Sequence, residues 1–325
     1  MLHSVFAAAP YISTEAKKIL ALMSESGAPE FGAPPLSVAR QVYAGLGSKL
    51  GGEVIEMASV EDLSMAGPGS TLPMRIYRPL ENSGQNGALI YFHGGGWILG
   101  GIETHDRLCR QIAMRSSCVV ISIGYRLAPE HPLPAAADDA IAAVRWVVDK
   151  ADFLRISGAL AVGGDSAGGG LAAYAALAAR DEQLPVRAQV LIYPSVDNRE
   201  SAHERYASRK TNAEVPPLTV QAMRNVAAYL AHEKALNEDI RLSPILGVQS
   251  RTSVPALILT AGADVLRDEG LRYGCELLDA GASVLIRNYP GAIHGFLEMP
   301  AALQVAQDAH ELIGLFLRQQ LIQKP

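Results

Sequence analysis

The amino-acid sequence predicts an α/β protein in which a mostly parallel central sheet is flanked by helices and covered by a helical cap. From residue 88 onward, short apolar runs alternate with longer amphipathic stretches, as expected for βαβ units. The short runs are almost continuously apolar, which is typical of parallel strands buried on both faces. A charged interval at about 197–239 breaks this alternation and indicates an insertion into the catalytic body.

Composition limits the classes of partner. With 325 residues, 49% hydrophobic and 19% charged, the chain can bury a large core. A formal net charge of −5 provides no basic surface for nucleic acid or anionic lipid. No apolar run approaches the roughly 18–20 residues of a membrane-spanning helix. We therefore expect a small-molecule partner, no membrane insertion and a cytoplasmic location.

The first fifty residues are expected to form short helices on loops. Ala16, Ile19, Leu20 and Met23 recur at helical spacing and are followed by glycine- and proline-rich stretches. We assign 1–50 to the N-terminal part of the cap and 51–325 to the catalytic domain, with the cap insertion at about 197–239.

The remaining elements follow in chain order. An antiparallel edge pair is predicted at Glu53–Val60 and Met74–Arg78. The buried strands are predicted at 88–92, 118–123, 160–163, 189–194, 256–262 and 284–290, and the helices at 135–150, 167–180, 268–280 and 301–321. Within the insertion, Thr219–Leu230 is amphipathic.

A candidate nucleophile lies between a predicted strand and a predicted helix. Residues 164–168 read Gly-Asp-Ser-Ala-Gly, and this G-x-S-x-G pattern between strand and helix is the context of a nucleophile elbow. Small neighbours permit the strained turn that exposes Ser166 Oγ. A structural glycine-rich turn is the alternative. A nucleotide site is disfavoured, because no lysine follows the glycines as in a P-loop.

An oxyanion-binding loop is predicted directly after the strand at 88–92. Residues 93–97 read His-Gly-Gly-Gly-Trp, so several backbone N–H groups can point into the site. We expect the donors to be the N–H groups of Gly95, Gly96 and Ala167. His93 suits a structural role in this loop, and Trp97 is expected to bind substrate.

The base and acid should follow the serine in the order Ser, Asp, His. His294 lies in a loop after the strand at 284–290, and Asp264 is the first acidic residue after the strand at 256–262. Asp268 and Glu269 suit the first turn of the next helix, where acidic side chains interact favourably with the helix dipole. We therefore predict a triad of Ser166, Asp264 and His294, with Asp264 preferred to Asp268.

Five motifs together resemble the bacterial hormone-sensitive-lipase-like carboxylesterases. They are HGGGW at 93–97, YRLAPEHPLPAAADD at 125–139, GDSAGG at 164–169, DVLRDEG at 264–270 and HGF at 294–296. The resemblance implies a capped α/β-hydrolase fold, the same triad and glycine loop, and homodimers. The chain departs from the family pattern at two positions, where Gly124 replaces an aspartate and Val265 a proline. In the second motif we expect Arg126 to pair with Glu130.

These features predict a serine carboxylesterase that hydrolyses short-chain carboxylic esters through an acyl-enzyme intermediate. An amidase or arylformamidase would use the same triad and oxyanion hole, so it stays open. A noncatalytic ligand-binding protein on the same scaffold would be expected to lose a triad member, and all three are present. Neither a cofactor nor a metal is expected, because the sequence has no H-E-x-x-H motif and its three cysteines form no C-x-x-C pair.

Overall fold

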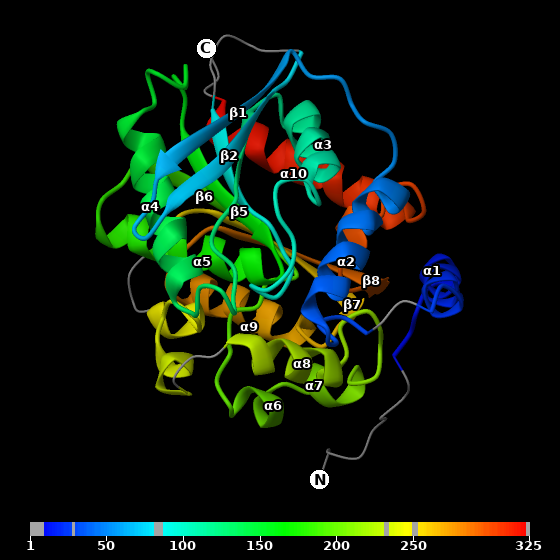
Figure 1. Ribbon diagram of the computed structural model, residues 1–325. Helices are drawn as coiled ribbons and strands as arrows, with labels where there is room; N and C mark the ends of the chain where they lie inside the picture. Colours follow the sequence, from blue (N-terminus) through cyan, green and yellow to red (C-terminus); the bar gives the residue numbers. More distant parts are fainter. Residues whose placement is uncertain (1–9, 28–29, 81–86, 231–233, 249–252, 323–325) are drawn as a thin grey trace.

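The computed structural model describes residues 10–27, 30–80, 87–230, 234–248 and 253–322. Within them, one eight-stranded sheet has the order β1-β2-β4-β3-β5-β6-β7-β8 (Figure 1). Its strands are β1 (Ser59–Ala66), β2 (Thr71–Arg78), β3 (Ala88–Phe92), β4 (Val119–Ile123), β5 (Leu160–Asp165), β6 (Val186–Ile192), β7 (Ala256–Ala263) and β8 (Val284–Ile293).

The sheet is mostly parallel, which confirms the predicted fold class. β2 pairs antiparallel with both β1 and β4, whereas the strands from β4 to β8 pair in parallel. Helices cover both faces, so every residue of β3, β4 and β5 is buried. This explains why these strands have no polar alternation in the sequence.

The edge strand β1 corrects one predicted boundary. We expected a strand at Glu53–Val60, but β1 begins at Ser59 and continues to Ala66. The apolar residues Ile55 and Met57, which suggested the strand, pack against the core from an irregular segment. Polar side chains in β1 are tolerated because only Met65 of this strand is buried.

Two layers of helices pack on the sheet. Helices α4 (Ala135–Asp149), α5 (Ala167–Asp181) and α9 (Arg267–Asp279) contribute to the same core cluster as Ile90 and Phe92. Helices α3 (Asp106–Ser116) and α10 (Gln304–Leu321) join the cluster that contains Leu89 and Tyr91. Successive β3 residues thus point to opposite faces, as the strand period requires.

The remaining helices come from the N-terminal residues and from the interval after β6. They are α1 (Thr14–Glu25), α2 (Leu36–Leu50), α6 (Ala202–Arg205), α7 (Ser208–Thr211) and α8 (Val220–Leu230), with the 3₁₀ turns η1 (Lys234–Glu238) and η2 (Pro244–Gly247). A further 3₁₀ turn, η3 (Phe296–Glu298), follows β8. In Figure 1, α2 and α6–α8 lie near the same end of the sheet. Asn225 of α8 donates a hydrogen bond to Glu30 at 3.5 Å, so the two segments touch. No helix in the described ranges is long and apolar enough to cross a membrane.

Candidate active site

Ser166 lies in a strained turn between β5 and α5. Its backbone has φ 55° and ψ −119°, a left-handed φ that costs a non-glycine residue about 1–3 kcal/mol. The flanking glycines are required by space, since a Cβ at Gly164 or Gly168 would overlap the Phe92 carbonyl oxygen. The Ser166 N–H donates to the Ile192 carbonyl at 2.9 Å. The local geometry is therefore that of a nucleophile elbow.

The structure brings the three predicted triad residues together although the chain separates them widely. His294 Nε2 lies 2.9 Å from Ser166 Oγ, and His294 Nδ1 lies 2.7 Å from Asp264 Oδ2. Because a carboxylate only accepts hydrogen bonds, Nδ1–H donates to Asp264 and leaves Nε2 to accept the serine proton. The other Asp264 oxygen accepts the Leu266 N–H at 3.0 Å, which fixes the carboxylate.

The surroundings of His294 shift its pKa in two directions. Burial is the largest single influence and lowers the pKa of His294. The charge and hydrogen bond of Asp264, with smaller contributions from Asp165 and Glu298, together outweigh burial and raise this pKa above its ordinary value. The imidazolium that forms when His294 accepts a proton is therefore stabilised.

The glycine loop after β3 presents backbone donors near Ser166. Gly95 and Gly96 have φ values of 119° and 62°, a region that glycine enters without steric penalty. Their N–H groups and that of Ala167 donate to no acceptor among the residues that the structure describes. Three donors are therefore available for an oxygen of a bound substrate.

His93 and Trp97 border this loop. His93 stacks on Tyr125 with ring centroids 4.2 Å apart, and its Nδ1 lies 2.7 Å from the Gly94 carbonyl oxygen. Burial, followed by the neighbouring His105, lowers the pKa of His93 to about 3, so His93 is neutral at pH 7. These contacts agree with a structural role. Trp97 lines a cavity beside Ser166 and has a positive φ of 61°.

Two cavities meet at Ser166. The larger, with a volume of about 420 Å³, is lined by Gly96, Trp97, Ala167 and residues of the α6–α8 region. The smaller, of about 60 Å³, is lined by Gly95, His294 and residues of both helical segments, among them Tyr43 and Leu218. The nucleophile thus lies between two compartments of very different size.

A second buried polar cluster lies behind the glycine loop, and the sequence did not predict it. Asp165 Oδ1 accepts the Gly94 N–H at 2.9 Å and the Tyr91 hydroxyl at 2.7 Å. His105 Nε2 lies 3.3 Å from the same oxygen and 3.8 Å from Glu298. The sequence feature that could have indicated this cluster is the acidic residue Asp165, directly before Ser166.

Charge compensation shifts the pKa values in this cluster. Burial lowers the pKa of His105, but Asp165 and Glu298 raise it, to about 9 overall. Burial raises the pKa of Asp165, yet His105 and the Tyr91 hydroxyl bring it below its ordinary value. The three ligand-type side chains His105, Asp165 and Glu298 lie within 4.8 Å of one another. Because Gly94 N–H and Tyr91 O–H point at Asp165 Oδ1, this oxygen already binds donors, and the cluster suits internal hydrogen bonding rather than a cation.

The predicted ion pair between Arg126 and Glu130 was wrong. Arg126 pairs with Asp139 at 2.7 Å, and Glu130 instead pairs with Arg40 of α2 at 2.7 Å. Glu269 lies in the first turn of α9, as predicted, and its side chain is fully buried. It forms an ion pair with Arg209 of α7.

Comparison with known proteins identifies a matching family and several similar enzymes. A family model described as alpha/beta hydrolase fold matches residues 89–298. Ethyl acetate hydrolase of Pseudomonas putida is 37% identical over 291 residues, which cover 87% of this chain and 90% of that protein. Esterase LipI of Mycobacterium tuberculosis is 39% identical over 77% of this chain and 78% of its own length.

A solved structure shares the fold. An ester hydrolase from the metagenome of Lake Arreo, complexed with a derivative of bipyridine phosphonate, superposes with a TM-score of 0.88 at 39% identity. The match covers 95% of this chain and 98% of that one. Together with the family match, it confirms the resemblance to hormone-sensitive-lipase-like esterases.

Proposed function

This chain belongs to the α/β-hydrolase-fold family and is a carboxylic ester hydrolase, and we propose that it cleaves short-chain esters with Ser166 as nucleophile. His294 acts as general base and then general acid, and Asp264 orients His294. The observation that carries this proposal is the continuous hydrogen-bonded path from Ser166 through His294 to Asp264 at a strained turn that borders two cavities.

In the first half-reaction, Ser166 Oγ attacks the ester carbonyl carbon while its proton passes to His294 Nε2. The carbonyl oxygen becomes negatively charged and accepts hydrogen bonds from the N–H groups of Gly95, Gly96 and Ala167. His294 then gives the proton to the departing alcohol oxygen. The C–O bond to the alcohol breaks, and an acyl-Ser166 ester remains.

In the second half-reaction, a water molecule attacks the acyl carbon and gives a proton to His294 Nε2. The same backbone donors hold the second oxyanion, and Ser166 recovers its proton from His294 as the carboxylic acid leaves. Asp264 keeps its negative charge throughout and stabilises the imidazolium.

The two cavities suggest how an ester is oriented. Since His294 must protonate the leaving oxygen, the alcohol belongs in the compartment of about 60 Å³ that His294 lines. The acyl group then occupies the cavity of about 420 Å³ next to Gly96 and Trp97. Arg199 and Glu200 also line this larger cavity. A long alkyl chain would remove water from such groups without replacing its hydrogen bonds, so we propose short acyl chains.

We further propose that residues 1–50 and 197–239 form one cap over the site, although 1–9, 28–29 and 231–233 lie outside the described residues. Both segments line the small cavity, through residues such as Tyr43 and Leu218.

A homodimer is proposed from the family resemblance, and sedimentation velocity tests it. A cytoplasmic location is proposed because Cys275 is a free, exposed thiol, and such thiols suit a reducing compartment. Cell fractionation tests it.

The nucleophile is tested by Ser166→Ala together with covalent labelling by a phosphonate. The variant should remain folded and lose about 10⁵- to 10⁶-fold in kcat, since only binding and oxyanion stabilisation remain. In the native protein, mass spectrometry should locate the label on Ser166. Substantial ester turnover by purified Ser166→Ala, or a label elsewhere, would reject the assignment.

The substrate class is tested with p-nitrophenyl esters of increasing acyl length, matched amides and a triglyceride emulsion. Each buried methylene should raise kcat/KM about fourfold until the cavity is full, after which kcat/KM should fall. A preference for emulsified long-chain lipid would place the chain among lipases, and faster cleavage of the amides would make it an amidase.

A further inference from the structure

We infer that the larger cavity contains a polar subsite at Arg209, which binds a neutral carbonyl oxygen on the acyl chain of the substrate. The preferred substrates would then be esters of oxo acids. The inference rests on the proposed function, because it adds a second recognition point to the same catalytic site.

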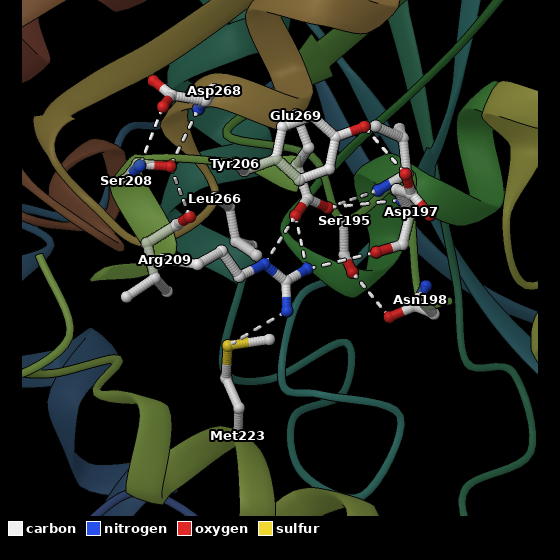
Figure 2. A network of polar contacts seen from close by, with 12 residues as sticks. Ser195, Asp197, Asn198, Tyr206, Ser208, Arg209, Met223, Leu266, Asp268 and Glu269 are labelled. Atoms are coloured by element: carbon white, nitrogen blue, oxygen red, sulfur yellow. Dashed lines mark hydrogen bonds and ion pairs between the residues drawn. The ribbon is translucent and has the colours of Figure 1, made fainter. Parts of the chain in front are cut away.

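Arg209 is held rigidly in the wall of this cavity. It lies in α7, is 4% exposed and lines the same cavity as Ser166. Figure 2 shows its guanidinium between Glu269 and Met223. Nε donates to Glu269 Oε2 at 3.1 Å, and Nη2 donates to the same oxygen and to the Asp197 carbonyl, the latter at 3.1 Å. These bonds fix the plane of the guanidinium.

The third nitrogen, Nη1, is the one left for a ligand. It lies 3.7 Å from the Met223 sulfur, and both Arg209 and Met223 line the cavity. A thioether is a weak acceptor, and Nη1 carries two N–H groups. Among the described residues, the Met223 sulfur is the sole acceptor that Nη1 meets. A buried charged donor in the cavity wall therefore lacks a strong acceptor.

Neighbouring polar side chains in the wall are already engaged with the protein. Ser195 Oγ donates to Asn198 Oδ1 at 3.2 Å, and the Asn198 side-chain amide donates to the Leu242 carbonyl. Figure 2 shows Ser195 and Asn198 turned toward each other. Arg209 thus offers the donor that a ligand can use without breaking a bond to an oxygen.

Charge balance favours a neutral acceptor over a carboxylate. Glu269 is fully buried and neutralises Arg209, and its second oxygen accepts the Val196 N–H at 3.0 Å. Among the other charged residues that line the cavity, Glu200 and Glu238 balance Arg199 and Arg224, so the wall has no net positive charge to attract an anion. A ketone oxygen satisfies Nη1 without bringing a further charge into the site.

The experiment compares ethyl esters of acids that bear a ketone at successive chain positions with esters in which a methyl-bearing carbon replaces that carbonyl. At the best position, kcat/KM for the oxo ester should exceed that of its branched counterpart about tenfold, as expected for a hydrogen bond to a charged donor. Equal values at every position would overturn the subsite but leave the proposed function intact. Failure to hydrolyse either series would reject the proposed function itself.

Two variants locate the effect. The double variant Arg209→Met with Glu269→Gln removes both charges, so neither partner is left buried and unpaired, and the oxo preference should fall to about one. Met223→Leu removes the competing sulfur and should increase the preference. Arg224→Gln, which removes an exposed cation from the same cavity wall, is the matched control and should leave the preference unchanged. If the preference disappears in Arg224→Gln, or fails to rise in Met223→Leu, the subsite is not at Arg209.

Discussion

Two histidine–aspartate pairs adjoin Ser166, and they differ in what the second imidazole nitrogen meets. His294 lies 2.7 Å from Asp264, and its Nε2 faces Ser166 Oγ at 2.9 Å. His105 lies 3.3 Å from Asp165, and its Nδ1 meets the Thr104 hydroxyl at 2.7 Å. The surroundings raise the pKa of both histidines. A carboxylate partner and a raised pKa therefore do not by themselves make a histidine a base.

The difference lies in access to the cavity. The His294 side chain is 12% exposed and borders the small cavity, whereas His105 is completely enclosed. Asp165 holds the Gly94 N–H at 2.9 Å, directly before the glycines proposed to bind the oxyanion. We interpret the first pair as the proton carrier and the second as the support of the loop.

The largest expected effect separates these two roles. His294→Ala should lower kcat/KM for a p-nitrophenyl ester by about 10⁵- to 10⁶-fold, because no base remains for Ser166. His105→Ala should retain far more activity per folded molecule, since it removes no reacting group. Folded fraction is measured by circular dichroism. Similar losses in two folded variants would contradict the division of roles.

The acid of the first pair is tested next. Asp264→Asn should lower kcat about 10⁴-fold, because an amide cannot hold His294 in the required tautomer or stabilise its cation. The matched variant is Asp268→Asn, whose carboxylate accepts the Ser208 N–H at 2.8 Å rather than binding His294. It should lose less than about tenfold. Steady-state kinetics that ranked the two variants in reverse would identify Asp268 as the acid.

The sequence predicted the first pair because each member follows a strand that local patterns reveal. Ser166 directly follows β5, Asp264 directly follows β7 and His294 directly follows β8. The carboxyl ends of neighbouring parallel strands meet at one edge of the sheet. Their approach is thus a consequence of topology.

The other polar contacts could not be predicted, because their partners come from distant segments. Arg126 pairs with Asp139 rather than the nearer Glu130, which Arg40 of α2 binds. In the sequence, the helix dipole alone accounts for an acidic residue in the first turn, such as Glu269. The structure shows that Arg209 of α7, a distant segment, is its partner. Sequence spacing carries no information on which of several charges will be enclosed together.

The second pair should affect stability in a pH-dependent way. The folded-state pKa of His105 is about 9, above an unfolded value of roughly 6.5. Its stabilising contribution is therefore complete below about pH 6.5 and is lost as pH rises through 9. His105→Asn should lower the free energy of unfolding by roughly 3–5 kcal/mol near pH 6.5, because Asp165 is left buried without its cation, and by less near pH 10. Urea unfolding at both pH values measures this, and a deficit that grew with pH would contradict it.

The smallest expected effect concerns Glu298, which lies near both histidines. It borders the small cavity with His294, and its negative charge is one of the influences that raise the pKa of His294. Glu298→Gln removes that charge while keeping a similar shape, so the acidic limb of the kcat/KM profile should move to lower pH. Burial, partly opposed by His105, raises the pKa of Glu298 to about 7, so the carboxyl is largely neutral on the acidic side of this limb and the displacement should stay below about one pH unit. The control is Glu311→Gln, which changes an exposed carboxylate paired with Arg115 and should leave the profile in place. A limb that stayed in place in Glu298→Gln, or moved equally in the control, would show that the Glu298 charge does not act on the catalytic imidazole and that the two pairs are electrostatically independent.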